Sequence, residues 1–307
     1  MFENPNLANF VEQISSDFFG DNSLQLTLFV LRLDKLHPYI SGNKWFKLKY
    51  NLLEAQKKKF QKILTFGGAH SNHILATAVA GQLFDLQTIG VIRGEELQQK
   101  LNPVLKQAQD FGMQFYFVSR EQYREQHKYS ANFIEKLKEV FGEFYLIPEG
   151  GSNSLALQGT SEILTFLKSY PIHFEHISSC VGTGGTLAGL AKSLYNSTTK
   201  LHGFAVLKNA GFLVEDIKKL LDVANFSPYQ DFTLHLDYHF GGYAKSDANL
   251  SNFIAEFHKK YNFCIEPVYT AKMFWGIADL AKKGFFKEKD KILAIHTGGT
   301  SMMQEVG

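Results

Sequence analysis

Apolar and polar positions follow two alternating periods along most of this chain. Short apolar runs rich in β-branched and aromatic residues predict strands, and longer stretches in which leucine, alanine and charged residues recur at helical spacing predict helices. Strands are predicted at 25–33, 62–66, 87–92, 113–118, 143–147, 174–181, 200–206 and 290–296. Helices are predicted at 46–59, 71–84, 98–111, 130–140, 155–169, 185–195, 247–260 and 270–283. Such alternation is typical of parallel sheets covered by helices.

The order of the predicted elements indicates an α/β fold with two domains. One series of strands and helices runs from residue 62 to residue 147, and a second series begins after the segment 148–153. A strand and a helix precede the first series, so the first sheet is expected to be inserted in the second. We therefore predict two open, mostly parallel twisted sheets flanked by helices, with residues 51–154 forming a small domain inserted in a large domain of residues 1–50 and 155–307.

Three glycine-rich turns, at 66–73, 180–186 and 296–300, stand at the carboxyl ends of predicted strands. The first two run directly into predicted helices, so their backbone N–H groups lie at helix N-termini, where anions bind. Because ligands of open α/β sheets bind beyond the carboxyl ends of the strands, a site is expected between the two domains. Lys44, in Ser-Gly-Asn-Lys, stands just ahead of a predicted helix, and a lysine with a lowered pKa can form a Schiff base with an aldehyde. Together these features suggest a phosphorylated aldehyde cofactor.

Composition narrows the possible partners of the chain. Its 307 residues carry a formal net charge of only +2, and nearly all of the basic residues are lysine, which argues against a nucleic-acid partner. The sequence has no apolar run of about 18 residues and no basic, then apolar, N-terminal segment. We therefore expect a cytoplasmic protein without a membrane partner.

Metal and disulfide chemistry are not indicated. Cys180 and Cys264 are far apart and form neither a zinc motif nor a disulfide framework, so both are expected to be reduced. His70 and His73 are three residues apart and His296 lies on another turn. No carboxylate accompanies them in the same motifs, and we expect no metal site.

Five separated motifs give the chain a family resemblance. They are Ser-Gly-Asn-Lys44, Gly-Gly-Ala-His-Ser-Asn72, Val-Gly-Thr-Gly-Gly-Thr186, Glu-Pro-Val-Tyr269 and His-Thr-Gly-Gly299. The chain resembles the fold-type-II pyridoxal-phosphate enzymes, which have a tryptophan-synthase-β-like fold, and among them the 1-aminocyclopropane-1-carboxylate deaminase and D-cysteine desulfhydrase group. The resemblance covers the chain from about residue 25 to the C-terminus. It implies pyridoxal 5'-phosphate as cofactor, bound by the large domain, and a small amino acid as substrate; we also expect a homodimer.

The first and third motifs supply the cofactor contacts that the resemblance implies. Lys44 is the lysine that forms the Schiff base with the cofactor. The glycine-rich loop wraps the cofactor phosphate with backbone donors and threonine hydroxyls, and it consists of Val181, Gly182, Thr183, Gly184, Gly185 and Thr186. Without the resemblance, such a loop is equally compatible with close backbone packing.

The second motif opens a predicted helix with Ser71, Asn72 and His73, whose free N–H groups could hold a substrate carboxylate. The resemblance implies that Asn72 approaches the pyridine hydroxyl and that Ser71 acts on the substrate. From the residues alone, either is equally an N-cap. Tyr269 and Tyr243 match two active-site tyrosines of the deaminases, although tyrosines in such positions are otherwise half-buried packing residues.

The chain departs from the deaminases at three places. Thr270 follows the first tyrosine, where the deaminases carry Glu, and Thr297 stands where they carry Leu; both substitutions follow the desulfhydrase pattern. A threonine hydroxyl near the pyridine nitrogen would give a neutral hydrogen bond and a weaker electron sink than a carboxylate. We predict that Thr297 contacts the cofactor and Thr270 the substrate. Trp45 and Phe46 replace Thr-Arg at the edge of the pocket.

Three functions are compatible with these patterns. The first is a lyase that converts D-cysteine by β-elimination to pyruvate, ammonia and sulfide. The second is ring opening of 1-aminocyclopropane-1-carboxylate to 2-oxobutanoate and ammonia, against which Thr270 and Thr297 count. The third, of a different class, is a non-catalytic nucleotide- or ligand-binding protein, because glycine-rich turns on parallel sheets also bind nucleotides. None of the turns has the dinucleotide or Walker spacing.

Overall fold

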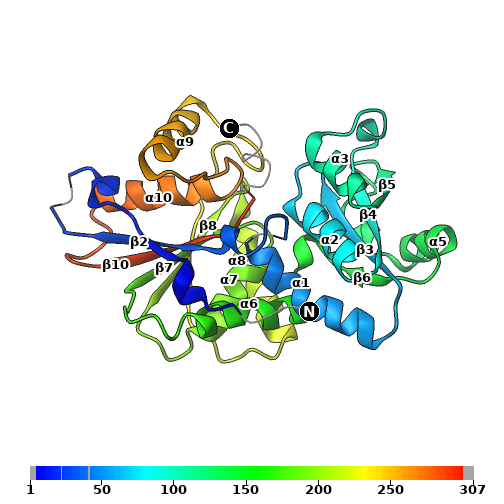
Figure 1. The fold of residues 1–307 in the computed structure, drawn as a ribbon, viewed down its shortest axis with the longest axis horizontal. Coiled ribbons are helices and arrows are strands. Elements are labelled where there is room, and N and C mark those ends of the chain that lie inside the picture. Colours follow the sequence, from blue (N-terminus) through cyan, green and yellow to red (C-terminus); the bar gives the residue numbers. More distant parts are fainter. Residues whose placement is uncertain (1–4, 22, 41, 300–307) are drawn as a thin grey trace.

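Two mainly parallel sheets form the framework of the molecule (Figure 1). The computed structural model describes residues 5–21, 23–40 and 42–299. The larger sheet has six strands in the order β1-β2-β10-β7-β8-β9; β1 pairs antiparallel with β2, and the other neighbours pair in parallel. In chain order its strands are β1 (Val11–Gln13), β2 (Thr27–Arg32), β7 (His176–Val181), β8 (Lys200–Ala205), β9 (Phe232–His235) and β10 (Lys291–His296).

The smaller sheet has four parallel strands in the order β5-β4-β3-β6. They are β3 (Lys62–Gly68), β4 (Gln87–Arg93), β5 (Gln114–Val118) and β6 (Tyr145–Ile147). All four lie between β2 and β7 in the sequence, so the chain leaves the larger sheet once and returns to it. The α/β fold with two mostly parallel sheets is therefore confirmed, whereas the division into domains at residues 51 and 154 stays a prediction.

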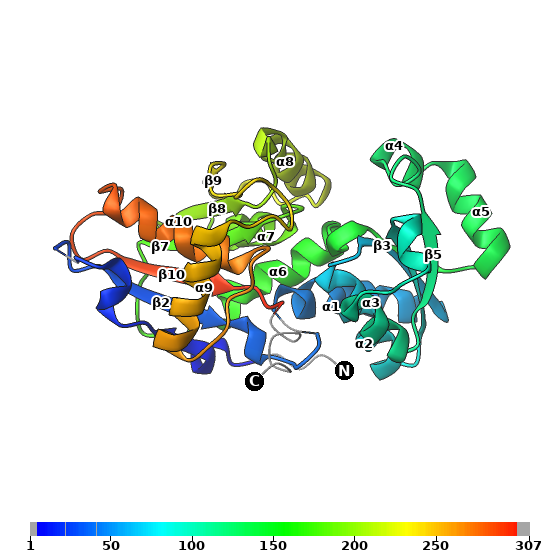
Figure 2. The ribbon, with the colours of Figure 1, turned by 90° about the horizontal axis from the view of Figure 1, so that it is seen from above.

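Helices pack on both faces of each sheet (Figures 1 and 2). Apolar residues of α1, α6, α7 and α8 pack on one face of the larger sheet, and those of α9 and α10 pack on the other. On the smaller sheet, α1, α2 and α3 cover one face and α5 covers the other. The helices are α1 (Asn43–Lys57), α2 (Asn72–Leu83), α3 (Pro103–Asp110), α4 (Glu125–Lys128), α5 (Ala131–Phe141), α6 (Ser154–Phe166), α7 (Gly185–Ser193), α8 (Leu213–Val223), α9 (Ala248–Tyr261) and α10 (Thr270–Lys282).

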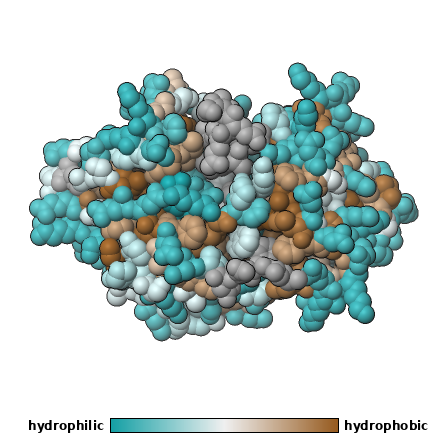
Figure 3. Space-filling view, in the orientation of Figure 1, coloured by the Kyte–Doolittle hydropathy of each residue, from teal (hydrophilic) through white to brown (hydrophobic). Residues whose placement is uncertain are grey.

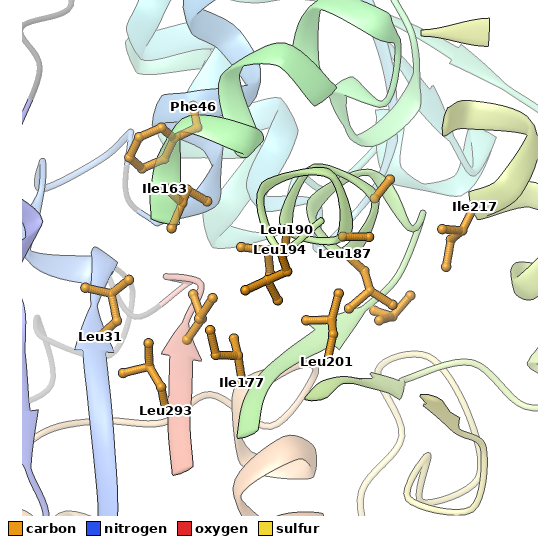
Figure 4. Packing of buried hydrophobic residues seen from close by; sticks show 14 of the residues in the cluster. Leu31, Phe46, Ile163, Ile177, Leu187, Leu190, Leu194, Leu201, Ile217 and Leu293 are labelled. Carbon is orange, nitrogen blue, oxygen red and sulfur yellow. The ribbon is translucent and has the colours of Figure 1, made fainter. Parts of the chain in front are cut away.

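The central strands are apolar along most of their length because both faces are buried. In β10, the four residues from Ile292 to Ile295 have no exposed surface. Figure 4 shows the face toward α6 and α7, where the side chains of four neighbouring strands meet those of the helices. The labelled residues of this layer include Leu31, Ile177, Leu201 and Leu293 from the strands and Ile163, Leu187 and Leu190 from the helices.

The helix α1 belongs to both halves of the molecule. Its Phe46 packs in the core of the larger sheet, and its Leu48 and Leu52 pack in the core of the smaller one. Gly159 of α6 lies against the backbone of α1, since a Cβ atom on this glycine would stand only 1.9 Å from the Phe46 carbonyl oxygen. This close contact fixes the start of α1 against α6, whose apolar residues pack on the larger sheet.

Three elements of the larger sheet and its covering helices were not predicted, namely β1 (Val11–Gln13), α8 (Leu213–Val223) and β9 (Phe232–His235). The helix has a regular apolar spacing at Leu213, Ile217 and Leu221, which the sequence displays. The two strands are short edge strands with no fully buried residue, so their patterns are weak. The predicted helix at 98–111 begins later, at Pro103, because Asn102 caps it and proline is favoured in the first helical position.

Hydrophilic side chains cover most of the outline of the face seen in Figure 3, and apolar ones gather toward its middle. In the part of the chain that the structure describes, no helix combines the length and the apolar character needed to cross a membrane.

Candidate active site

A cavity of about 720 Å³ opens at the carboxyl ends of strands from both sheets. Its wall includes Gly68 at the end of β3, Arg93 at the end of β4 and Cys180 near the end of β7. Most of the residues predicted for the site line it: Lys44, Ser71, Asn72, His73, Gly182, Thr183, Gly184, Thr186, Tyr243, Tyr269 and Thr297. The tertiary structure thus brings residues from five separated motifs to one cavity.

Lys44 lies in the first turn of α1, which begins at Asn43 and therefore earlier than the predicted start at residue 46. Gly42 precedes the helix with a positive φ of 68°, and a Cβ atom there would stand 1.8 Å from the Thr297 carbonyl oxygen. Only glycine fits this approach. The Asn43 N–H donates to the same oxygen at 3.3 Å, so the loop after β10 holds the lysine in place.

The amine of Lys44 is prepared to react as a neutral nucleophile. Its Nζ donates to Asn43 Oδ1 at 2.9 Å, and Asn43 Nδ2 donates to Thr186 Oγ1 at 2.7 Å. Burial lowers the pKa of Lys44 to about 8, against the opposing charge of Glu266. Near neutral pH a larger fraction of the amine is therefore unprotonated than in an exposed lysine.

The N-terminus of α7 faces the cavity without a side-chain cap. Its N-cap residue, Gly184, has a φ of 80° and makes no side-chain capping hydrogen bond. The first N–H groups of a helix have no partner within the helix, and the helix dipole adds positive charge there. With the hydroxyls of Thr183 and Thr186 on the same cavity wall, this end of α7 is suited to bind an anion.

A second lysine, Lys47, belongs to the same wall and was missed in the sequence. Its side chain is almost fully buried, and its Nζ donates to Gly150 O at 2.9 Å, to Ser152 Oγ at 3.0 Å and, weakly, to Thr183 Oγ1 at 3.4 Å. Burial and the nearby Lys44 lower its pKa well below that of a free lysine. Because Lys47 follows Lys44 by three residues in a helix, it shares the same helix face, and this spacing could have indicated it.

Ser71 is the N-cap of α2, since its Oγ accepts a hydrogen bond from the Ile74 N–H at 3.4 Å. It also lines the cavity. The capping alternative is therefore correct for Ser71, and the residue remains close enough to contact a ligand. Asn72 packs against the loop after β10, because a Cβ atom on Gly299 would lie 2.6 Å from its Nδ2.

His73 is buried and has one free acceptor. The Thr65 hydroxyl donates to Ile147 O at 2.8 Å, so it accepts from His73 Nε2 at 2.9 Å. The lone pair therefore lies on Nδ1, which has no hydrogen-bond partner among the described residues. Burial, together with Lys44 and Lys47, lowers the pKa of His73 well below its usual value and keeps the ring neutral.

Tyr243 and Tyr269 meet across the cavity with their rings edge to face, 6.0 Å apart between centroids. Tyr243 Oη donates to His70 O at 3.4 Å, which joins the larger half of the molecule to the loop before α2. The ring of Tyr269 packs against the glycine-rich loop, since a Cβ atom on Gly182 would lie 3.1 Å from it. Burial raises the pKa of both tyrosines, so both are neutral phenols.

Thr297 lines the cavity beside a neutral thiol. Its Oγ1 lies 2.9 Å from Sγ of Cys180, and burial raises the pKa of Cys180 to about 12. Neither group carries a charge at neutral pH.

Three predicted residues do not reach the cavity wall. Val181 is buried in the core of the larger sheet. Gly185 faces Ser152, whose Oγ would lie 2.7 Å from a Cβ atom on this glycine. Thr270 has no exposed surface and its hydroxyl is engaged with Glu266, from whose N–H it accepts at 2.9 Å. The arrangement gives no support to the predicted contact of Thr270 with a substrate.

The described residues contain no group of three or more His, Cys, Asp or Glu side chains placed to hold a metal ion. His296, one of the three histidines of the turns, is fully buried; its Nε2 donates to Cys264 O at 2.8 Å. Its role is therefore structural.

The family model that describes pyridoxal-phosphate dependent enzymes matches residues 17–298, which is most of the chain. This chain belongs to the pyridoxal-phosphate dependent enzyme family. Pyridoxal 5'-phosphate is accordingly its cofactor, and the prediction made from the five motifs is confirmed.

Individual relatives of this pyridoxal-phosphate enzyme are named for two activities. A Pyrococcus furiosus protein, provisionally assigned as a 1-aminocyclopropane-1-carboxylate deaminase, is 33% identical over 89% of this chain and 85% of its own length. A bifunctional D-cysteine desulfhydrase/1-aminocyclopropane-1-carboxylate deaminase of Arabidopsis thaliana, mitochondrial, is 28% identical over 89% of this chain and 72% of its own. The crystal structure of an ACC deaminase homologue superimposes with a TM-score of 0.83 at 28% identity, covering 98% of this chain and 90% of that one.

The donor set of the cavity fits a phosphorylated aldehyde. The uncapped end of α7 offers donors and partial positive charge to a phosphate, and two threonine hydroxyls and the amino group of Lys47 add further donors. Lys44, with its lowered pKa, offers the amine that an aldehyde needs.

Proposed function

We propose that this enzyme removes the β-substituent of a small amino acid, with D-cysteine as its preferred substrate. D-cysteine and water would then give pyruvate, ammonia and sulfide. Family membership supports an enzyme over a non-catalytic binding protein, and the plant relative bears the D-cysteine desulfhydrase name. The observation that carries the choice of substrate is the neutral pair of Cys180 and Thr297.

Several residues would hold the cofactor. The backbone N–H groups at the start of α7, Thr183, Thr186 and Lys47 would bind its phosphate. Lys44 would bind its aldehyde carbon, and Asn72 would face its hydroxyl. When bound, pyridoxal phosphate supplies a conjugated ring that withdraws electrons from the substrate carbon attached to the amino group.

Lys44 is also the residue proposed to move the proton. Its amine, with a pKa of about 8, can accept a proton from the α-carbon of the substrate near neutral pH and return it later. The start of α2, capped by Ser71, would bind the substrate carboxylate through N–H groups that lie beyond the cap. The phenols of Tyr243 and Tyr269 are neutral and can donate hydrogen bonds to the substrate or to the leaving group.

The neutral pair favours a substrate with an acidic α-proton and a good leaving group. If Thr297 faces the ring nitrogen, as the family resemblance implies, it offers a hydroxyl whose nearest partner is the protonated thiol of Cys180. The carboxylate of Glu266 is occupied by backbone N–H groups. A nitrogen without a carboxylate partner makes the ring a weaker electron sink. D-cysteine can tolerate this, because it has an α-proton and loses sulfide readily.

Ring opening of 1-aminocyclopropane-1-carboxylate is the second candidate, and the names of the Pyrococcus and plant relatives support it. This substrate has no α-proton, so the ring carbon must be attacked or deprotonated directly. A weak electron sink is a disadvantage for that reaction.

A side-by-side substrate panel tests the proposal. The formation of 2-oxo acid would be measured with D-cysteine, L-cysteine, D-serine and 1-aminocyclopropane-1-carboxylate, and sulfide would be followed in the two cysteine reactions. The largest kcat/KM is expected with D-cysteine. A larger value with the cyclopropane acid would make the deaminase the correct assignment, and no reaction with any of the four would place the substrate outside both.

We further propose that the large domain of residues 1–50 and 155–307 carries the cofactor, that residues 51–154 form the small domain, and that the enzyme is a cytoplasmic homodimer. Sedimentation of the purified protein tests whether it is a dimer.

A further inference from the structure

The loop that carries Tyr243 has an unusual backbone. Phe240, Gly241, Gly242 and Ala244 all have positive φ angles, of 50°, 89°, 119° and 54°. Left-handed conformations are costly for residues with a Cβ atom, and here they occur on both sides of the tyrosine. Such a backbone persists only where surrounding contacts hold it.

The loop has hydrogen bonds of its own, and one buried side chain from outside it supplies two more. Lys272, in the first turn of α10, has no exposed surface. Its Nζ donates to His239 O at 2.9 Å and to Gly242 O at 2.8 Å. Hydrogen bonds from an ammonium group are stronger than those between neutral groups, and here they hold the start of the loop and the residue directly before Tyr243.

The second cavity tyrosine, Tyr269, precedes the first turn of α10, and the carboxylate of Glu266 holds its backbone. Both carboxylate oxygens of Glu266 accept N–H groups at the start of the helix, from Val268 at 2.7 Å and from Tyr269 at 2.9 Å. Burial lowers the pKa of Lys272 to about 8, and the charge of Glu266 opposes this shift. Two buried residues of opposite charge, close together in sequence, thus each hold the backbone of one cavity tyrosine.

We propose that Lys272 is a positioning residue of the active site, which holds the 239–244 loop so that Tyr243 stands beside Tyr269 and reaches the His70 carbonyl group. Lys272 does not line the cavity and touches no reacting group. It acts through Tyr243, whose hydroxyl bridges the larger half of the molecule to the loop before α2. The effect on turnover rests on the proposed function, whereas the effect on the loop does not.

The loop itself is tested by hydrogen–deuterium exchange on the enzyme with bound cofactor. Lys272→Met keeps the length of the side chain and removes the ammonium, and Lys282→Met, at the exposed end of the same helix, is the matched control. Exchange in peptides covering 237–246 should rise about tenfold or more in Lys272→Met and should not change in Lys282→Met. Unchanged exchange of this segment in Lys272→Met, or an equal rise throughout the larger sheet, would overturn the proposal.

A double-mutant cycle with Tyr243→Phe tests whether Lys272 acts through the tyrosine. Lys272→Met should lower kcat/KM for the best substrate of the panel by about tenfold, and in the Tyr243→Phe background the same change should cost less than about twofold. Equal losses in both backgrounds would show that the lysine acts elsewhere and would overturn the proposal.

The two proposals fail separately. If the exchange result holds but none of the panel substrates reacts, the function is wrong and the positioning of the loop stands. If the wild-type enzyme converts D-cysteine and Lys272→Met exchanges and reacts as the control does, the function stands and the positioning role is wrong.

Discussion

The N-termini of α2 and α7 face the same cavity, and they differ in their capping. The start of α2 carries its own cap, Ser71, whose side chain accepts the Ile74 N–H. The start of α7 has no side-chain cap; it follows Gly184, and Lys47 approaches it through Thr183. A helix end without a cap has unpaired N–H groups that favour a permanent anion. A capped end has one of its N–H groups already paired, so it holds an anion less firmly and suits one that comes and goes.

This difference assigns the two ends to two ligands. The end of α7 is proposed for the cofactor phosphate, which stays bound through many turnovers. The end of α2 is proposed for the substrate carboxylate, which leaves as product. Lys44, at the start of α1, is joined through Asn43 to Thr186 of α7 and lies near His73 of α2. The following predictions test this assignment.

The largest effect is expected at Lys44, which serves both ligands. In Lys44→Ala, turnover should fall by at least about a thousandfold, because no other described lysine of the cavity combines its position with a pKa of about 8.

In the wild-type apoenzyme, the rate of cofactor capture should rise with pH and level off above about pH 8, since the neutral amine is the reactive form. Stopped-flow absorbance would follow the capture. Borohydride reduction and peptide mapping should place the cofactor on Lys44; a label on Lys47 would exchange their roles.

The next effect is expected at the uncapped helix end. In Gly184→Asp, a side chain at a φ of 80° and a negative charge enter beside the proposed phosphate, and the Cβ atom would lie 2.4 Å from Ile217. The affinity of the apoenzyme for pyridoxal phosphate should fall about a hundredfold. Titration of the apoenzyme would measure it, with circular dichroism to check the fold. Gly211→Asp is the matched control, because nothing lies within 4 Å of a Cβ atom there. Equal affinities of the two variants would remove the end of α7 from the cofactor site.

A smaller loss of cofactor affinity is expected from Lys47→Met. This change removes a buried amino group that donates to Thr183, and affinity should fall about tenfold. The exposed Lys57→Met, at the other end of α1, should leave the affinity unchanged. The same titration decides. An unaltered affinity in Lys47→Met would mean that the lysine only ties the loop of Gly150 and Ser152 to the helix.

The smallest effect is expected at the capped end. Ser71→Ala should lower the free energy of unfolding by about 1 kcal/mol, and Ser71→Asp, which can still cap, should keep it. The aspartate would repel a substrate carboxylate, so it should raise KM several-fold while the affinity for pyridoxal phosphate stays the same. Denaturant unfolding and steady-state kinetics would measure the two effects. If Ser71→Asp keeps both its stability and the wild-type KM, Ser71 serves only as a helix cap.

Much of the fold and of the cavity could be predicted because the signals are local. The apolar runs of β3 and β10 and the glycine-rich turns after β3 and β7 are contiguous in the sequence, and each turn has to face the carboxyl edge of its sheet. Lys47 was missed although its spacing from Lys44 is a helical one. The amphipathic α8 was missed as well. The edge strand β9 that follows it has a weak pattern, so the alternation of strand and helix was not recognised in this region.

Other features could not be read from the sequence because they join distant residues. The neutral partner of Thr297 is Cys180, 117 positions away, and the hydroxyl of Thr270 turns away from the cavity toward Glu266. Lys272 reaches the carbonyl groups of a loop about thirty positions earlier, and nothing in the local pattern marks it. Burial also sets the protonation of these groups, and burial depends on the packing of whole elements.

The sequence by itself determined the alternation of strands and helices, the places where the backbone needs glycine, and the lysine at the start of α1, because each depends on residues adjacent along the chain. Only the tertiary structure decided that the end of α7 stays uncapped while Ser71 closes α2, that Lys47 joins the anion-binding wall, and that Lys272 holds the loop of Tyr243. Those properties come from the distances between elements and from the exclusion of water between them, which side chains fix only when the two sheets and their helices have packed together.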